Sequence, residues 1–181
     1  MNSNTIKERN QEDIVELKGY IPKISREDAI KIARKKPFFR RERGTINSVM
    51  LLYKPFLLLH YNATVKHKKR KSDAAENIEL YIAVDMITGL GFESESIEPL
   101  TTIRVRRNQV IKPLINRDKA LSEAKRLILK LKTRMSKYGL VIINEEFVEL
   151  GIVYRPIWII KFVNNDKETY VGVDGLKGVR L

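Results

Sequence analysis

The chain has 181 residues, of which 43% are hydrophobic and 31% are charged, as in a globular protein. It contains no cysteine, which excludes disulfides, thiolate catalysis and cysteine-ligated zinc or iron–sulfur sites. Its 35 Lys and Arg against 22 Asp and Glu give a formal net charge of +13. A charge of this size favours an anionic partner: nucleic acid, a ribosome, an anionic membrane or an acidic protein.

The N-terminal residues are polar and carry no apolar core of a signal peptide. No apolar run reaches the roughly 18 residues that a membrane span needs. We therefore expect a cytoplasmic protein. Residues 1–22 are expected to be an arm that docks on the body, or a short helix over residues 5–18. Two folded units are expected to follow, at residues 23–113 and 114–181.

Two apolar, β-favouring stretches resemble one another, at residues 49–62 and 150–164. Each has a tyrosine, a basic residue and a proline at its centre. These central residues are Tyr53 with Pro55, and Tyr154 with Pro156. Because proline has no N–H to donate to a neighbouring strand, each motif predicts a bend or bulge in a long strand.

A helix start precedes each of these stretches. Residues 25–30 and 116–121 both begin with a good N-cap residue followed by acidic residues, which is typical of a first helical turn. The periodicity predicts one helix from Arg26 to about Lys35, and a longer one from Arg117 to about Tyr138.

A strand that ends in aspartate follows each stretch, with a glycine four residues later. The pairs are Asp85 with Gly89, and Asp174 with Gly178. Aspartate bonds nearby backbone and glycine accepts a positive φ, so both pairs predict a turn. Three landmarks in the same order predict an internal duplication, although ordinary patterning could also give two similar pieces. The predicted fold is α+β, with two repeated units, each a helix packed on a small antiparallel β-sheet.

Positive charge is concentrated early in the chain. Residues 1–33 hold six basic and six acidic side chains, whereas residues 34–71 hold twelve basic and one acidic, a net +11. Such a concentration favours a binding face over general solubility. Arg40, Arg41 and Arg43 follow two phenylalanines, a mixture that can stack on unpaired bases and meet phosphates. Alternatively, the phenylalanines enter the core and the arginines are solvated.

The densest run of charge is at residues 66–71. Its like charges repel one another, which predicts an exposed loop tip. The run could clamp phosphates, or it could be a solvated hairpin tip. It also resembles a nuclear-localisation pattern, which has low specificity. The candidate phosphate-binding residues are Lys66, Lys68, Lys69, Arg70 and Lys71.

The longer predicted helix has an apolar stripe on one side and a basic ridge on the other. The ridge contains Arg126, Lys130 and Arg134 at a spacing of four residues. It could lie along a nucleic-acid backbone or on a membrane surface, or it could be the wet face of an amphipathic helix. An acidic strip at residues 93–98 could neutralise basic residues of the same chain or of a second copy.

Catalytic and metal-binding patterns are missing from the sequence. His60 and His67 are the two histidines, and no Gly-rich phosphate loop or helical metal-ligand pair is present. Glu145 and Glu146 are adjacent, so their side chains should diverge on an extended segment. Neither Tyr53 nor Tyr154 has a candidate acid or base near it in sequence. We therefore expect a protein that is not an enzyme and uses no cofactor or metal.

Two segments resemble PepSY-like domains, which have a cystatin-like α+β fold. Residues 25–33 are similar to the opening helix of that family. Residues 170–179 are similar to its closing strand, in which an aromatic residue, an aspartate and a turn glycine recur. The resemblance implies a helix packed on an antiparallel sheet, and binding or inhibitory roles. The chain departs from the family by lacking an export signal and by its positive charge.

The functional hypothesis is a non-enzymatic, basic, cytoplasmic binding protein. Its positively charged face is expected to contact nucleic acid: RNA, the ribosome or the DNA backbone. The alternative is a protein-interaction or scaffold module that uses sheet edges or the acidic strip at residues 93–98. A homodimer is one form that such a module could take. A third hypothesis is peripheral binding to an anionic membrane through the helix at residues 117–138.

Overall fold

The structure is a computed structural model and describes residues 13–35, 44–68, 75–94, 97–165 and 167–181. About half of the described residues are in strands: 55% are strand and 22% are helix. The described α-helices are α2 (Arg26–Arg34) and α3 (Arg117–Lys137), and a short 3-10 turn covers Arg107–Gln109. Both α-helices match the helices that the sequence predicts.

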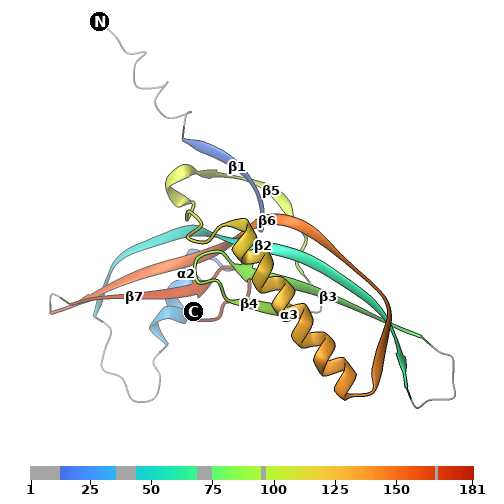
Figure 1. The fold of residues 1–181 in the computed structure, drawn as a ribbon. Coiled ribbons are helices and arrows are strands. Elements are labelled where there is room, and N and C mark those ends of the chain that lie inside the picture. Colours follow the sequence, from blue (N-terminus) through green and yellow to red (C-terminus); the bar gives the residue numbers. More distant parts are fainter. Residues whose placement is uncertain (1–12, 36–43, 69–74, 95–96, 166) are drawn as a thin grey trace, which may run out of the picture. The chain divides into compact units, whose positions relative to one another are not determined.

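The described strands form one mixed sheet in the order β4-β3-β2-β6-β1-β5, with β7 also paired to β6 (Figure 1). The predicted fold class, two repeated units with a small antiparallel sheet each, is therefore wrong. The seven strands are β1 (Ile14–Gly19), β2 (Thr45–His67), β3 (Glu76–Asp85), β4 (Gly91–Ser94), β5 (Thr101–Arg106), β6 (Leu140–Asn164) and β7 (Lys167–Asp174).

The chain divides into two compact units that are not contiguous in sequence. Unit 1 contains Met1–Lys54, Leu100–Ile111 and Tyr154–Leu181; unit 2 contains Pro55–Pro99 and Lys112–Val153. The expected units were contiguous instead. In unit 1, helix α2 packs against β7, and in unit 2, helix α3 packs against β3 and β4. Neither helix therefore packs mainly against the strand that follows it in sequence.

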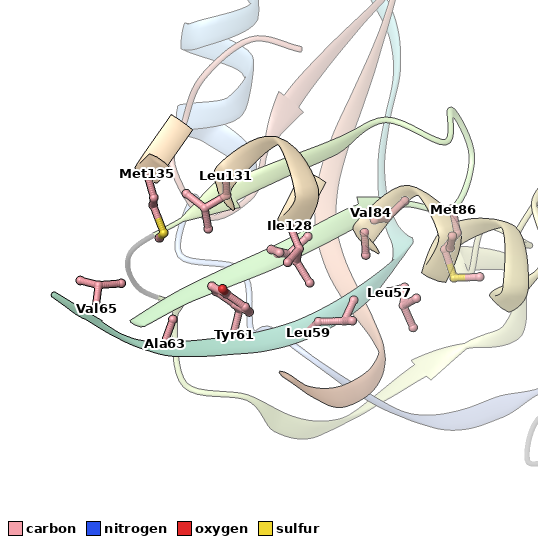
Figure 2. Close-up of a cluster of buried hydrophobic side chains, with 13 residues drawn as sticks. Leu57, Leu59, Tyr61, Ala63, Val65, Val84, Met86, Ile128, Leu131 and Met135 are labelled. Atoms are coloured by element: carbon pink, nitrogen blue, oxygen red, sulfur yellow. The ribbon is translucent and has the colours of Figure 1, made fainter. Parts of the chain in front are cut away.

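The core of unit 2 lies between α3 and the strands β2 and β3. Figure 2 shows Ile128, Leu131 and Met135 of α3 pointing toward the side chains of β2, including Leu59 and Tyr61. Both Leu59 and Tyr61 are buried. The predicted apolar stripe of the helix is confirmed as core. The sheet therefore covers this stripe of α3.

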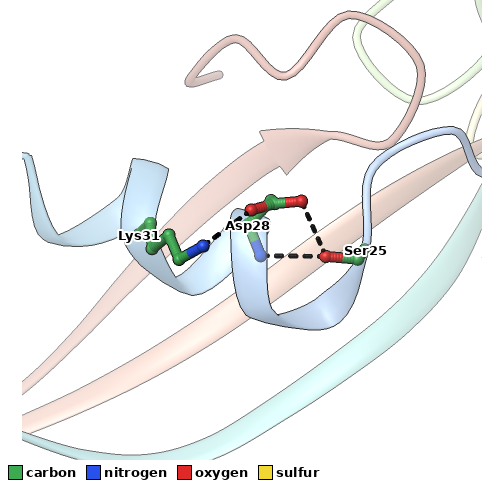
Figure 3. Close-up of polar contacts among 3 residues, drawn as sticks. All are labelled: Ser25, Asp28 and Lys31. Atoms are coloured by element: carbon green, nitrogen blue, oxygen red, sulfur yellow. Dashed lines mark hydrogen bonds and ion pairs between the residues drawn. The ribbon is translucent and has the colours of Figure 1, made fainter.

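The core of unit 1 contains helix α2, which is short and well capped. Ser25 Oγ accepts a hydrogen bond from the Asp28 amide at 3.1 Å and donates to Asp28 Oδ2 at 2.9 Å (Figure 3). These bonds, together with Lys31 at 3.1 Å, lower the pKa of Asp28, with the Ser25 bond as the largest cause. Ala29 and Ala33 are fully buried, and their small side chains let the helix lie close to β6 and β7.

The N-terminal segment is a strand where it is described, not a helix. Strand β1 pairs antiparallel with β5, with Val15 opposite Val105 and Leu17 opposite Ile103. Val15 and Leu17 pack toward a small cluster that includes Tyr53. The apolar residues therefore alternate with a period of two, which fits a strand and not a helix. The rest of the predicted arm, residues 1–12, lies outside the described residues.

The two proline motifs lie within strands that continue through them. Strands β2 and β6 run past Pro55 and Pro156, and both prolines are buried. Each proline carbonyl accepts a hydrogen bond: Pro55 O from the Met86 amide at 3.1 Å, and Pro156 O from the Gly175 amide at 2.9 Å. The missing proline N–H therefore does not end either strand, as the prediction of one long strand through each motif requires.

The two Asp–Gly turns are confirmed and have the same hydrogen bonds. Asp85 Oδ1 accepts from the Ile87 amide at 2.9 Å, and Asp174 Oδ1 accepts from the Leu176 amide at 2.8 Å. The glycine in each turn has a positive φ, +75° at Gly89 and +64° at Gly178. A side chain would be strained in that conformation, which is the reason for glycine there.

The residue after each aspartate joins the turn to a helix start. Met86 O accepts from the amides of Leu114 and Ile115, at 2.9 and 3.0 Å, just before α3. Gly175 O accepts from the amides of Lys23 and Ile24, at 2.8 and 3.0 Å, just before α2. The matched contacts thus join each strand end to the start of the helix that docks there.

The Asp174 turn also contains a buried ion pair, which leads to a test of stability. Arg155 Nη2 lies 2.6 Å from Asp174 Oδ2, and the Asp174 side chain is 7% exposed. We expect Asp174→Ala to lower the free energy of unfolding by about 3–5 kcal/mol, because it leaves the half-buried Arg155 without its partner. Glu16→Ala, which breaks the exposed pair with Arg104, should cost under about 1 kcal/mol. Urea denaturation measures both, and similar losses for the two variants would contradict the prediction.

Candidate nucleic-acid interface

The predicted site residues divide into two groups. Arg40, Arg41, Arg43, Lys69, Arg70 and Lys71 lie outside the described residues. Lys66, Lys68, Arg126, Lys130 and Arg134 are described, and all five belong to unit 2.

The basic ridge of α3 is exposed, as its spacing predicts. Arg126, Lys130 and Arg134 lie four residues apart, so their side chains share one side of the helix. Lys137 continues the ridge in the last turn, where cations also interact favourably with the helix dipole. The ridge therefore presents a line of positive charge along the solvent side of α3.

Two cations of the ridge are neutralised within unit 2. Arg126 Nε donates to Glu123 Oε2 at 2.7 Å, and Arg134 Nη2 donates to Glu93 Oε2 at 2.6 Å. The Arg126 bond lowers the pKa of Glu123, and the charge of Lys130 lowers it further. The net positive charge of the ridge is therefore concentrated toward Lys130 and Lys137.

A backbone contact brings the second predicted cluster to the end of this ridge. The Lys68 amide donates to the carbonyl of Gly139 at 2.8 Å. Gly139 has φ +75° and follows α3 by two residues, so the end of β2 meets the end of the helix. We call Lys66, Lys68, Lys130, Arg134 and Lys137 together the basic helix end.

A polar cluster beside the helix was missed by the sequence reasoning. The Tyr61 hydroxyl donates to Glu145 Oε2 at 2.9 Å, and Lys132 Nζ pairs with Glu145 Oε1. Burial, followed by the bond to Glu145, raises the pKa of Tyr61. The sequence pattern of Glu145 and Glu146 predicts only that their side chains diverge. Tyr61 and Lys132 lie far from Glu145 in sequence, so no local motif indicates this contact.

The tyrosines of the two proline motifs are packed among apolar side chains. Burial raises the pKa of both Tyr53 and Tyr154. Both rings pack with the β1–β5 pair of unit 1. Their described role is therefore packing.

Searches for other kinds of site and for relatives found nothing that assigns an activity. Among the described residues, no group of three or more His, Asp or Glu side chains could hold a metal ion. No described helix combines the length and apolar character that a bilayer crossing requires. Comparisons with protein-family models, curated proteins and solved structures found no match.

The Lys132–Glu145 contact predicts how stability depends on pH. The hydrogen bond from Lys132 is the largest cause that lowers the pKa of Glu145 below its ordinary value of 4.5. The folded protein keeps this carboxylate ionised at lower pH than the unfolded chain does. Its contribution to stability is therefore present above about pH 4.5 and is lost as the pH falls through the folded-state pKa.

We expect Glu145→Gln to lower the urea midpoint at pH 7 and to have a smaller effect at an acidic pH below the folded-state pKa, where the wild-type carboxylate is protonated. Glu146→Gln, which removes the neighbouring charge, is the matched control and should leave the midpoint nearly unchanged at both values. An effect of Glu145→Gln that is as large at the lower pH would show that the charge is not its cause.

Proposed function

We propose that the protein binds nucleic acid through the basic helix end. The observation that carries this proposal is the bond from the Lys68 amide to the Gly139 carbonyl. It places residues of the 66–71 run beside the last turn of α3. The charged run at the end of β2 and the basic ridge of α3 thereby meet at one end of unit 2.

The proposed contacts are to phosphates, because the side chains concerned are lysines and one arginine on an exposed surface. Lysine acts on phosphate as a point charge, which carries no base information. Binding is therefore expected to be strong at low salt, to weaken steeply as salt rises, and to depend little on sequence. Net charge of +13 supports the same mode through long-range attraction.

A charge-reversal experiment tests the proposal. We expect Lys130→Glu combined with Lys137→Glu to weaken RNA and DNA binding by roughly tenfold or more at about 50 mM salt, and to reduce the salt dependence. The control combines Lys167→Glu with Lys177→Glu, which makes the same charge change at exposed positions of unit 1. Fluorescence anisotropy with labelled RNA and DNA measures the affinities. Absence of binding by the wild-type protein, or equal losses in the two variants, would contradict the proposal.

A second candidate function is self-association, favoured by exposed apolar side chains on β6. Ile143 is 54% exposed and Phe147 is 48% exposed, and both belong to the half of β6 that lies in unit 2. Exposed apolar side chains that lie close together can form the contact surface for a second chain.

If β6 mediates a homodimer, Ile143→Glu should convert the dimer to a monomer in light scattering, whereas Ile14→Glu, at an equally exposed isoleucine of β1, should not. A monomeric wild-type protein at high concentration would remove this candidate. A protein partner that survives nuclease treatment would favour it over nucleic-acid binding.

A further inference from the structure

One face of the β2–β3 pair carries rings and amides. Side chains of β2 alternate, so that Leu57, Leu59 and Tyr61 enter the core while His60 and Asn62 take the opposite face. In the antiparallel register, His60 lies opposite Tyr81, Asn62 opposite Glu79 and Thr64 opposite Asn77. We call these six residues the platform.

The two rings of the platform are held together by a carboxylate. His60 and Tyr81 stack with their centroids 4.9 Å apart and an interplanar angle of 26°. His60 Nε2 lies 2.8 Å from Glu79 Oε1, and the Tyr81 hydroxyl donates to the same oxygen at 3.4 Å. Both side chains remain partly exposed, with His60 at 27%. The rings are thus ordered before any ligand arrives, which lowers the entropy cost of stacking on them.

Polar groups that can read base edges lie next to the rings. Asn62 and Asn77 are exposed, and an amide both donates and accepts hydrogen bonds. The Thr64 hydroxyl donates to Asn77 Oδ1 at 3.1 Å, which orients that amide. Rings with adjacent amides on an open sheet face are the means by which proteins bind splayed-out bases.

The platform continues along β2 to Lys66, at the edge of the basic helix end. Lys66 is on the same side of β2 as His60, Asn62 and Thr64, because these residues are two apart. At about 3.3 Å per residue, His60 and Lys66 are about 20 Å apart along the strand. Bases on the platform could therefore belong to a strand whose phosphates reach Lys66 and Lys68.

We infer that the platform binds unpaired bases of single-stranded nucleic acid whose backbone contacts Lys66 and Lys68, the part of the basic helix end that β2 supplies. This inference rests on the proposed function and names its substrate class. A duplex keeps its bases stacked internally and offers only phosphates, so it gains from the cations and not from the rings. The protein should therefore bind a single strand more tightly than a duplex of the same length.

The chain contains a matched control site in unit 1. Lys161 lies opposite Tyr170 in the β6–β7 register, and Lys161 Nζ pairs with Glu168 Oε1 at 2.6 Å. The Tyr170 hydroxyl donates to Glu168 at 2.9 Å, as Tyr81 does to Glu79. In this site a lysine lies over the tyrosine ring, 5.8 Å from its centroid, in place of a second ring. Tyr170→Leu therefore removes an exposed tyrosine with the same carboxylate contact but no ring stack.

The experiment uses the full chain and fluorescein-labelled RNA of about 12 nucleotides, single-stranded or annealed into a duplex. We expect Tyr81→Leu to weaken single-strand binding by roughly tenfold, within the range for loss of one stacked base, and to leave duplex binding unchanged. Tyr81→Phe keeps the ring and should keep the affinity. Tyr170→Leu should behave as wild type on both probes, and thermal melts confirm that each variant is folded.

The outcomes separate this inference from the function on which it rests. If Tyr81→Leu and His60→Leu both stay within about twofold of wild type while the Lys130→Glu and Lys137→Glu variant loses binding, the platform is refuted and the basic helix end stands. Equal losses on single strand and duplex also refute the platform. If the wild-type protein binds neither probe, both proposals fail.

Discussion

The structure depends on how two strand ends are joined to two helix starts. In each turn an aspartate carboxylate accepts backbone amides, and the carbonyl of the next residue accepts two amides from the segment that leads into a helix. The bonds at Met86 fix the entry of α3, and those at Gly175 fix the entry of α2. A short helix contributes little stability alone, so this docking is what lets α2 and α3 bury their apolar sides. The basic ridge faces solvent because the opposite side of α3 is held on the sheet.

Local features of the fold could be predicted from the sequence. Ser25 and Asn116 cap their helices because a side-chain oxygen accepts from an amide three residues later, which needs no long-range information. The Asp–Gly turns are equally local. The hairpin between β6 and β7 is local too, because Asn164 pairs with Lys167 there.

Pairing between distant segments could not be predicted in the same way. Helix α2 packs against β7, which begins more than a hundred positions later, and no local pattern records that choice. The strands β2 and β6 continue through their prolines, and the two units divide at these motifs, between residues 54 and 55 and between residues 153 and 154. The prediction of two separate small sheets was wrong because each of these long strands supplies residues to both units.

The candidate site shows the same division between local and distant information. The exposure of Lys130 and Arg134 follows from helical spacing, but the neutralisation of Arg134 by Glu93 requires the packing of α3 beside β4. His60 was noted only as one of two histidines. Its stack with Tyr81 depends on the register of β2 with β3, which only the folded chain reveals.

The assembly of unit 1 from both ends of the chain has a consequence for biosynthesis. Unit 2 has all its residues once position 153 has been made, whereas α2 lacks its packing partners until residues 154–181 follow. Because domains fold as they emerge from the ribosome, α2 must wait with Ala29 and Ala33 uncovered while unit 2 forms. During translation, unit 2 can therefore fold before unit 1 is complete. The N-terminal segment, which is made first, is then the part most exposed to proteases and aggregation.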